Sequence, residues 1–179
     1  LQALQLGPRY IRQALNRMWL YATTEAHLQA YSQPDAESAE YREITQLLHG
    51  AIAGRRGDMI FADLHTTSVE SIPFVLLGDT LRNRDFVLGV PVPKVLGIEE
   101  QRNGPLLSYI NELGHISMAF EAGSHQSPAS VDRHEAFIWL CLFRACLVSQ
   151  EEHADLYTKY HRLLTAHSSG LSRFFELRY

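Results

Sequence analysis

The sequence predicts an α/β domain with a mixed, partly parallel sheet flanked by helices. Two observations carry this prediction. Short apolar runs alternate along the chain with longer segments whose apolar residues recur at helical spacing. Glycine and proline separate these segments, and strands that alternate with helices favour parallel pairing. A chain of 179 residues is long enough for one domain with its own core and short for two.

The helices are predicted from apolar spacing and from residues that begin or end a helix. The first lies between Asp35, a suitable N-cap, and Gly54, a residue type that ends helices. Ser127 and Pro128 suit the cap and the first position of another helix. The remaining helices are expected at 81–88, 106–113, 128–148 and 151–166. Residues 9–20 have no clear period, so both a helix and an extended loop stay open there.

The strands are predicted from short apolar runs that close on polar or turn residues. The run at 115–120 alternates between apolar and other residues and closes on Glu121. The other strands are expected at 59–67, 72–77, 94–98 and 173–179.

Composition argues against several classes of partner. The formal net charge of −4 gives no reason to expect nucleic acid or an anionic membrane surface. The longest apolar run, residues 136–148, contains Arg144 and is too short to cross a bilayer. Cys141 and Cys146 are five positions apart on a helical pattern, so they point apart and should stay buried free thiols in a reducing compartment. No signal peptide is visible, and we expect a cytoplasmic protein.

Two strand ends carry residues suited to chemistry. In open α/β sheets ligands bind outside the carboxyl ends of the strands, where Asp63 and His65 close the first run. An imidazole there can ligate zinc, and a carboxylate beside it can orient the ring. Glu121, at the end of another apolar strand, can act as a general base and then as an acid. The alternatives are a histidine that only caps a strand and a solvated loop carboxylate.

A basic stretch near the start is the third candidate. Arg9, Arg12 and Arg17 lie close together in sequence, and Asn16 precedes the last of them. An arginine fork binds a carboxylate through two hydrogen bonds, and asparagine can add a donor. This stretch therefore suits an anionic substrate group, and the alternative is a solvated face.

Complete local catalytic motifs are absent from the sequence. It contains no Gly-x-Ser-x-Gly elbow, no P-loop and no Rossmann glycine pattern. None of the nine histidines is followed three residues later by glutamate. The chain therefore holds at most one ligand of a familiar three-ligand zinc site.

Three segments in this order resemble the aspartoacylase and succinylglutamate desuccinylase family, which is related to zinc carboxypeptidases. The segments are Arg9-Tyr10-Ile11 leading to Leu15-Asn16-Arg17, then Phe61-Ala62-Asp63-Leu64-His65-Thr66-Thr67, then Phe120-Glu121-Ala122-Gly123. The resemblance spans residues 9–148, and the set of segments is specific although no single motif is. It implies a carboxypeptidase-like catalytic domain over 1–170 whose N-terminal part is missing, and the start of a C-terminal β domain at 171–179.

The resemblance also implies a role for each matching residue. His65 would ligate Zn²⁺, and Glu121 would activate the water and protonate the leaving amine. Arg9 would stabilise the developing oxyanion. Asn16 and Arg17 would bind the carboxylate of the amino-acid part. Tyr109 lies near the place of a substrate-contacting tyrosine of the family, at a spacing that does not match cleanly.

Three features depart from the family pattern. The other two zinc ligands, from a His-x-x-Glu motif upstream of Arg9, are not in this sequence, so the chain is a fragment, its ends are not represented, or the protein has lost its metal. Ala14 stands where an aspartate usually precedes Leu-Asn-Arg. Arg102 or Asn111 stands in the region of a further family arginine, so the group recognised need not be an aspartyl side chain.

The preferred hypothesis is a zinc-dependent hydrolase that cleaves the amide bond of an N-acyl amino acid. The alternatives are a zinc carboxypeptidase acting on short peptides and a metal-free binding or scaffold domain that keeps the fold. The expected partner is a small-molecule substrate, without nucleic acid or membrane, and a homo-oligomer stays open. We expect these 179 residues alone to be inactive, because one imidazole holds zinc poorly.

Overall fold

The computed structural model describes residues 10, 14–19, 35–98 and 105–178. Its centre is a five-stranded sheet in the order β1-β4-β2-β3-β5. The strands are β1 Ile60–Thr67, β2 Phe74–Leu76, β3 Lys94–Leu96, β4 Ile116–Ser124 and β5 Phe174–Glu176. β4 pairs parallel with β1 and antiparallel with β2, while β3 is parallel to both β2 and β5. The predicted mixed, partly parallel sheet is confirmed.

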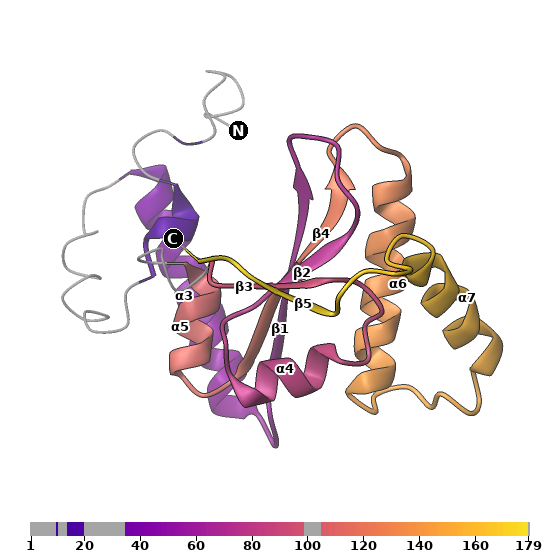
Figure 1. Ribbon diagram of the computed structural model, residues 1–179. Coiled ribbons are helices and arrows are strands. Elements are labelled where there is room, and N and C mark those ends of the chain that lie inside the picture. The colour runs from indigo at the N-terminus through magenta and orange to yellow at the C-terminus, as the bar shows by residue number, and fades with distance from the viewer. Residues whose placement is uncertain (1–9, 11–13, 20–34, 99–104, 179) are drawn as a thin grey trace.

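Helices lie on both sides of this sheet (Figure 1). On one side are α3 and α5, and on the other are α6 and α7, with α4 at the end drawn lowest in the view. Their bounds are α3 Ala36–Gly54, α4 Leu81–Val87, α5 Leu106–Glu112, α6 Ala129–Arg144 and α7 Ala154–Thr165. A short 3-10 turn, η1 Leu15–Arg17, occupies part of the N-terminal segment for which helix and loop were both open.

The predicted first helix forms as expected. Asp35 is the N-cap of α3, and its Oδ1 accepts a hydrogen bond from the backbone N–H of Ser38 at 2.7 Å. The helix turns its apolar side toward Met18, Trp19 and Ile110 and there buries Tyr41, whose ring centroid lies 4.7 Å from that of Trp19. This small cluster covers the α3 and α5 side of the sheet.

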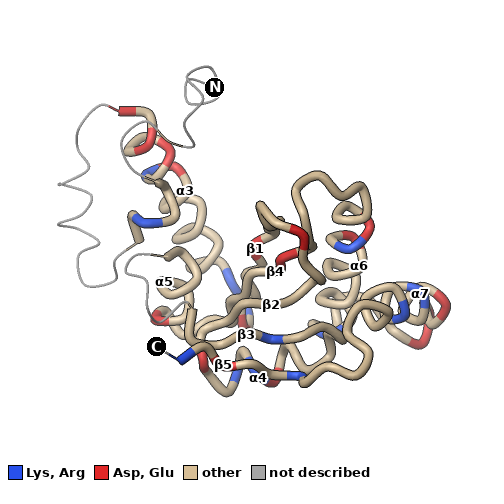
Figure 2. The backbone as a smooth tube through the Cα atoms, turned by 45° about the horizontal axis from the view of Figure 1, so that its top comes forward, with Lys and Arg blue, Asp and Glu red and all other residues tan. Residues whose placement is uncertain are grey.

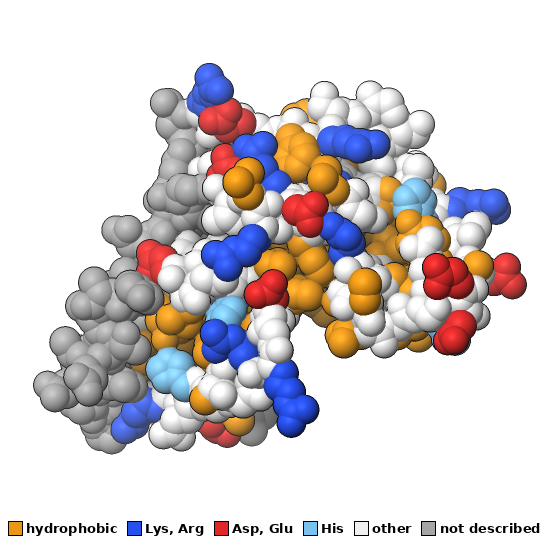
Figure 3. Space-filling view, turned by 90° about the horizontal axis from the view of Figure 1, so that it is seen from below, with side chains coloured by type: hydrophobic (Ala, Val, Ile, Leu, Met, Phe, Trp, Pro, Cys, Tyr) orange, Lys and Arg blue, Asp and Glu red, His pale blue; other side chains and the backbone are white. Residues whose placement is uncertain are grey.

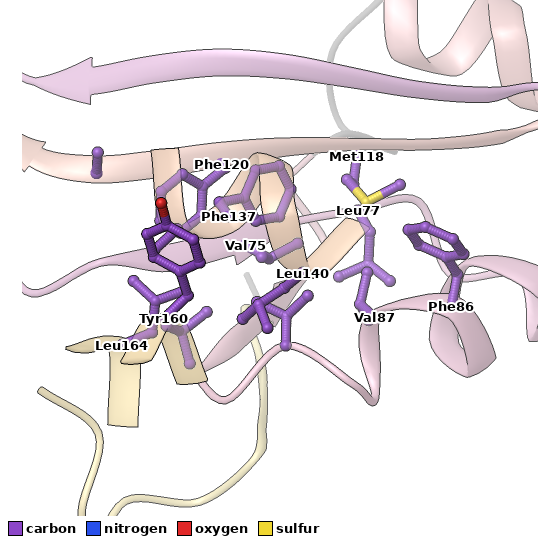
Figure 4. Packing of buried hydrophobic residues seen from close by; sticks show 14 of the residues in the cluster. Val75, Leu77, Phe86, Val87, Met118, Phe120, Phe137, Leu140, Tyr160 and Leu164 are labelled. Atoms are coloured by element: carbon purple, nitrogen blue, oxygen red, sulfur yellow. The ribbon is translucent and has the colours of Figure 1, made fainter. Parts of the chain in front are cut away.

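The larger core lies on the α6 and α7 side. Phe120 of β4 stacks on Phe137 of α6 with ring centroids 4.3 Å apart, and both rings are fully buried. Met118 and Leu77 lie beside them, as Figure 4 shows. Burying such side chains supplies the main driving force for docking the helices on the sheet, about 1.5–3 kcal/mol for each large one.

β4 differs from its prediction in length and in burial. It continues past Phe120 to Ser124, so Glu121 lies inside the strand rather than after it. The continuation forms because β1 provides a partner strand as far as Thr67. Nearly every β4 residue is buried, including Ser117, whose Oγ donates to the Leu107 carbonyl of α5. A strand covered by helices on both faces does not show a polar face.

Two helix ends also differ from their predictions. α6 stops at Arg144 rather than near 148, and its N-cap is Pro128 rather than Ser127, without a side-chain capping hydrogen bond. α7 begins at Ala154 rather than at 151. Both differences shorten a helix at the connection between the two, where the chain turns back on itself (Figure 1).

The C-terminal strand belongs to the sheet just described. β5 pairs with β3 and forms the edge opposite β1. The assignment of residues 171–179 to a further β domain stays a prediction. Cys141 and Cys146 are free, as predicted, and burial raises the pKa of the Cys141 thiol to about 12. The predicted burial of Cys146 is wrong: it follows the end of α6 and is exposed. None of the helices in the described part of the chain is long and apolar enough to span a membrane. Hydrophobic side chains reach the surface seen from below, among charged ones (Figure 3).

Candidate active site

The candidate site lies toward the carboxyl ends of the parallel pair β1 and β4. His65 is directly opposite Glu121 in the register, two positions beyond the pair Asp63 and Ala119. Residues opposite each other, and residues two apart on one strand, point to the same face of a sheet. The structure therefore brings Asp63, His65 and Glu121 together, and Figure 2 shows acidic positions on these adjoining strands.

His65 is oriented by its strand neighbour. Its Nε2 lies 2.8 Å from Asp63 Oδ2, and both side chains are about a third exposed, at 39% and 31%. A carboxylate only accepts hydrogen bonds, so Nε2–H is the donor. In the neutral ring the lone pair then lies on Nδ1, which is the atom able to take a proton or to bind a metal ion. The sequence-based expectation of a carboxylate beside this ring is confirmed.

Glu121 has one carboxylate oxygen without a partner. Oε2 is buried and receives no hydrogen bond within the described residues. Burial raises the pKa of Glu121 above its ordinary value; the charge of His65 opposes this rise, while Asp63 adds to it. A carboxylate whose pKa is moved toward neutrality by a dry environment is suited to take a proton from water and return it.

Two further histidines act on this carboxylate. His125 and His134 both lower the pKa of Glu121 through their charge, and less strongly than His65 does. The His134 Nε2–H donates to the backbone carbonyl of His65 at 2.9 Å, and its ring meets Phe120 edge-on at 5.7 Å. Sequence reasoning missed both residues. His134 belongs to α6, and only the packing of α6 on the sheet brings it to β1.

An irregularity in the strand pairing follows Glu121 immediately. From His65 to Thr67 the register advances two positions on β1 but three on β4, which places a β-bulge beside the candidate base. Bulges next to active sites redirect side chains. The bulge contains Gly123, with φ of +102°, a conformation that favours glycine.

The same glycine makes room for an arginine. A Cβ at Gly123 would lie 2.5 Å from Arg133 Nη1 and 3.1 Å from the Ser71 carbonyl. The Arg133 Nη1–H donates to the Ala122 carbonyl at 2.9 Å. The Glu-Ala-Gly segment therefore has a structural reason for its glycine, because α6 holds the backbone directly after Glu121.

Asn16 and Arg17 lie on the α3 and α5 side of the sheet. The residues that follow them, Met18 and Trp19, pack in the small cluster that also contacts Phe61 of β1, on the face that carries His65. The Asn16 Oδ1 accepts a hydrogen bond from the Leu106 N–H, the first of α5, at 3.0 Å. Sequence reasoning missed this helix contact. Binding of a substrate carboxylate by Asn16 and Arg17 stays a prediction.

Tyr109 is part of the core. Its side chain is buried, at 3% exposure, and its hydroxyl lies 2.7 Å from His49 Nε2. Its ring centroid is 5.7 Å from that of Trp19. A substrate contact at Tyr109 stays a prediction. The structure shows it linking α5 to α3.

The other arginines considered lie outside the described residues. These are Arg9, Arg12 and Arg102. Asn111, the alternative to Arg102, accepts a hydrogen bond from Asn83 Nδ2 at 2.9 Å. The fully buried Asn83 also donates to the Gly78 carbonyl and accepts from the Ser117 N–H, so Asn111 belongs to a polar network that joins α5, α4 and β4.

The described residues do not make a complete metal site by themselves. A catalytic zinc ion is bound by three protein ligands. No group of three His, Cys, Asp or Glu side chains that could hold a metal occurs in the described part of the chain. His65 fits the role of one ligand through Nδ1, and a complete site needs donors from elsewhere.

The fold and the site define a mixed α/β domain with a histidine and two carboxylates at the carboxyl ends of parallel strands. Solved structures of the succinylglutamate desuccinylase and aspartoacylase family have this fold. The succinylglutamate desuccinylase from Chromobacterium violaceum matches with a TM-score of 0.54 and 18% identity, over 99% of this chain and 53% of that one. The same enzyme from Vibrio cholerae matches with a TM-score of 0.54 and 16% identity, over 99% and 49%.

A third similar structure is a product-bound form of the ectoine utilization protein EutE (DoeB) from Ruegeria pomeroyi. It matches with a TM-score of 0.56 and 15% identity, over 98% of this chain and 48% of that one. The chain thus spans about half the length of the structures it matches. No protein-family model and no curated protein sequence matches it. These likenesses confirm the fold expected from the resemblance.

Proposed function

We propose that this chain is part of a zinc-dependent hydrolase that cleaves the amide bond of an N-acyl amino acid. One observation carries the proposal. The buried, unpartnered carboxylate oxygen of Glu121 lies on the strand position opposite His65, at the carboxyl ends of a parallel strand pair. The names of the similar structures, desuccinylases among them, support the same class of substrate.

The reaction follows from what Glu121 can do. Its carboxylate takes one proton from a water molecule while the water oxygen bonds to the amide carbonyl carbon. The same proton is then given to the amide nitrogen as the carbon–nitrogen bond breaks, which leaves a carboxylic acid and a free amine. The raised pKa of Glu121 suits both transfers, because a stronger base takes the first proton more readily.

Other residues have supporting roles in this proposal. Asp63 holds the His65 ring so that Nδ1 can bind a zinc ion, whose remaining ligands would come from outside the described residues. Zinc, when bound, supplies Lewis acidity and a lowered water pKa. Arg9 would stabilise the negative oxygen. Arg17, with the Asn16 Nδ2–H, would bind the carboxylate of the amino-acid part.

The test uses the full-length natural protein loaded with zinc. Release of free amine is measured on a panel of N-acyl amino acids and on short peptides with free C-termini. The Glu121→Gln variant should lose at least a hundredfold in kcat at unchanged zinc content. Glu112→Gln, an exposed change of the same charge on α5, is the matched control and should retain activity.

The outcomes separate the candidate functions. Release from N-acyl amino acids supports the proposal, and release of C-terminal residues from peptides supports a zinc carboxypeptidase instead. A protein that binds no zinc and releases neither product would be a binding or scaffold domain. Zinc content of His65→Ala, measured without any assay of activity, tests the metal ligand separately.

A further inference from the structure

A polar cavity lies beside β3, two strands away from Glu121 in the sheet. It has a volume of about 280 Å³ and opens between the segment before β3, the second half of α7 and the segment before β5. In the sheet order, β2 lies between β4 and β3, whose residue Lys94 lines this cavity. Its polar lining residues are Lys94, His161, Thr165, Ser168, Ser172 and Arg173.

Lys94 is the unusual residue of this cavity. Its side chain is 2% exposed, although lysine is almost never fully buried without a partner. Its Nζ donates to the backbone carbonyl of Val90, which lines the same cavity. An ammonium group has three N–H donors, and within the described residues this carbonyl is the one acceptor that Nζ meets. Two donors are thus available to a ligand.

The charge around Lys94 is positive and uncompensated. Burial, together with the nearby charge of Arg173, lowers the pKa of Lys94 to about 8. The lining contains no aspartate or glutamate. The chain as a whole carries a net charge of −4, so this pairing of two cations is not a consequence of overall composition.

Hydrogen bonds connect the segments that line the cavity around these two cations. The Ser168 Oγ–H donates to the Pro91 carbonyl at 2.5 Å, which ties the end of α7 to the segment before β3. The backbone N–H of Lys94 donates to the Arg173 carbonyl at 2.9 Å, which fixes the two basic residues side by side. The backbone around the cavity is therefore held in place before any ligand arrives, which lowers the entropic cost of binding.

We propose that this cavity binds a phosphate group, held between the Lys94 ammonium and the Arg173 guanidinium. A lysine ammonium and an arginine fork are the side chains that bind phosphate oxygens most strongly. A phosphate dianion would neutralise both cations and accept the two remaining Lys94 N–H donors. The volume exceeds that of one phosphate ion, so the group can belong to a small phosphorylated molecule. This site is independent of the proposed hydrolase activity.

The test measures phosphate binding to the full-length protein by isothermal titration at pH 7, in chloride buffer of constant ionic strength. Inorganic phosphate is the first probe, and ribose 5-phosphate distinguishes a phosphorylated molecule from the free ion. Arg173→Gln should weaken binding at least tenfold. Lys159→Gln removes the same charge from an exposed position on α7 that does not line the cavity, and it should leave binding unchanged.

A second readout follows the Lys94 amine itself. The pKa of the Lys94 amine, followed by NMR of its ε-methylene group, should rise when phosphate is added and also rise in Arg173→Gln. Equal weakening in Arg173→Gln and Lys159→Gln, or a Lys94 pKa that phosphate does not move, would overturn the proposal. Lys94→Met should abolish binding, and if that variant does not fold, the Arg173→Gln comparison still decides.

Discussion

Replacing Glu121 by glutamine separates a catalytic carboxylate from a structural one. The substitution keeps the shape of the side chain and removes its charge. Oε2 is buried without a hydrogen-bond partner, and burial raises the pKa of the group. A structural carboxylate would be paired, so its loss would destabilise the fold. Loss of this one should remove a buried charge that nothing in the described residues satisfies.

The expected changes in stability and activity therefore have opposite signs. The fold should gain about 1–2 kcal/mol at pH 7, because glutamine puts a neutral amide where a carboxylate charge is desolvated, and a buried unsatisfied charge costs more than a neutral polar group. Loss of a general base should lower kcat by about 10²–10⁴-fold. Stability gained with activity lost is characteristic of a residue retained for function.

The pH dependence of the free energy of unfolding tests the predicted stabilisation by Glu121→Gln in a second way. Because the folded-state pKa of Glu121 is raised, the folded protein holds this proton more tightly than the unfolded chain does. Its contribution to stability is present at low pH and is lost as pH rises through the folded pKa. The gain from Glu121→Gln should thus be larger at pH 7 than at pH 4.

Urea unfolding at the two pH values measures this gain, with Glu112→Gln as the matched exposed control. A variant less stable than the natural protein at pH 7, with full hydrolysis of N-acyl amino acids, would refute both parts of the reasoning. A gain that is equal at the two pH values would show that folding does not raise the pKa of Glu121.

Three other substitutions or conditions test the surroundings. Gly123→Ala should destabilise the protein by about 1–3 kcal/mol in urea unfolding, because φ is +102° and the new Cβ would meet Arg133 Nη1. Gly50→Ala is the control: it lies in open space within α3 and should stabilise the protein by about 0.5–1 kcal/mol. Asn16→Ala removes the acceptor for the first N–H of α5 and should cost about 0.5–2 kcal/mol, seen as faster hydrogen exchange in that helix; unchanged exchange would contradict the contact. Lys94 has a pKa of about 8 in the folded protein, against an ordinary 10.5. The free energy of unfolding should therefore rise by about 1–2 kcal/mol, after allowing for solvent screening, as pH increases from 8 to 10.5. This rise should be absent in Lys94→Met.

Local patterns were sufficient to predict most of the fold. Asp35 caps α3 because its side chain reaches an N–H only three residues away, which is a contact that sequence alone specifies. The apolar runs at β1 and β4 identify two strands that are buried between helices. Parallel pairing of these strands then places His65 opposite Glu121, at the edge of the sheet where α/β folds bind ligands.

Contacts between distant segments could not be predicted in the same way. Asn16 reaches the N–H of Leu106 across 90 positions, and His134 reaches the carbonyl of His65 across 69. The spacing of apolar residues along the sequence does not predict such contacts, because each depends on how a helix packs against the sheet. The β-bulge after Glu121 could not be predicted from the sequence either, because a shift in register is a property of two paired strands and not of either one.

The surroundings of two carboxylates distinguish their roles at this site. Asp63 and Glu121 both lie close to His65, but Asp63 accepts the His65 Nε2–H, while Glu121 keeps a buried oxygen with no partner among the described residues. The first carboxylate therefore orients the ring, and the second is the one that can exchange a proton with a reacting water. The bulge and the Arg133 contact hold the backbone just beyond Glu121. A carboxylate that is held in place by so much of the fold, with one buried oxygen unpartnered among the described residues, is better explained by chemistry than by stability.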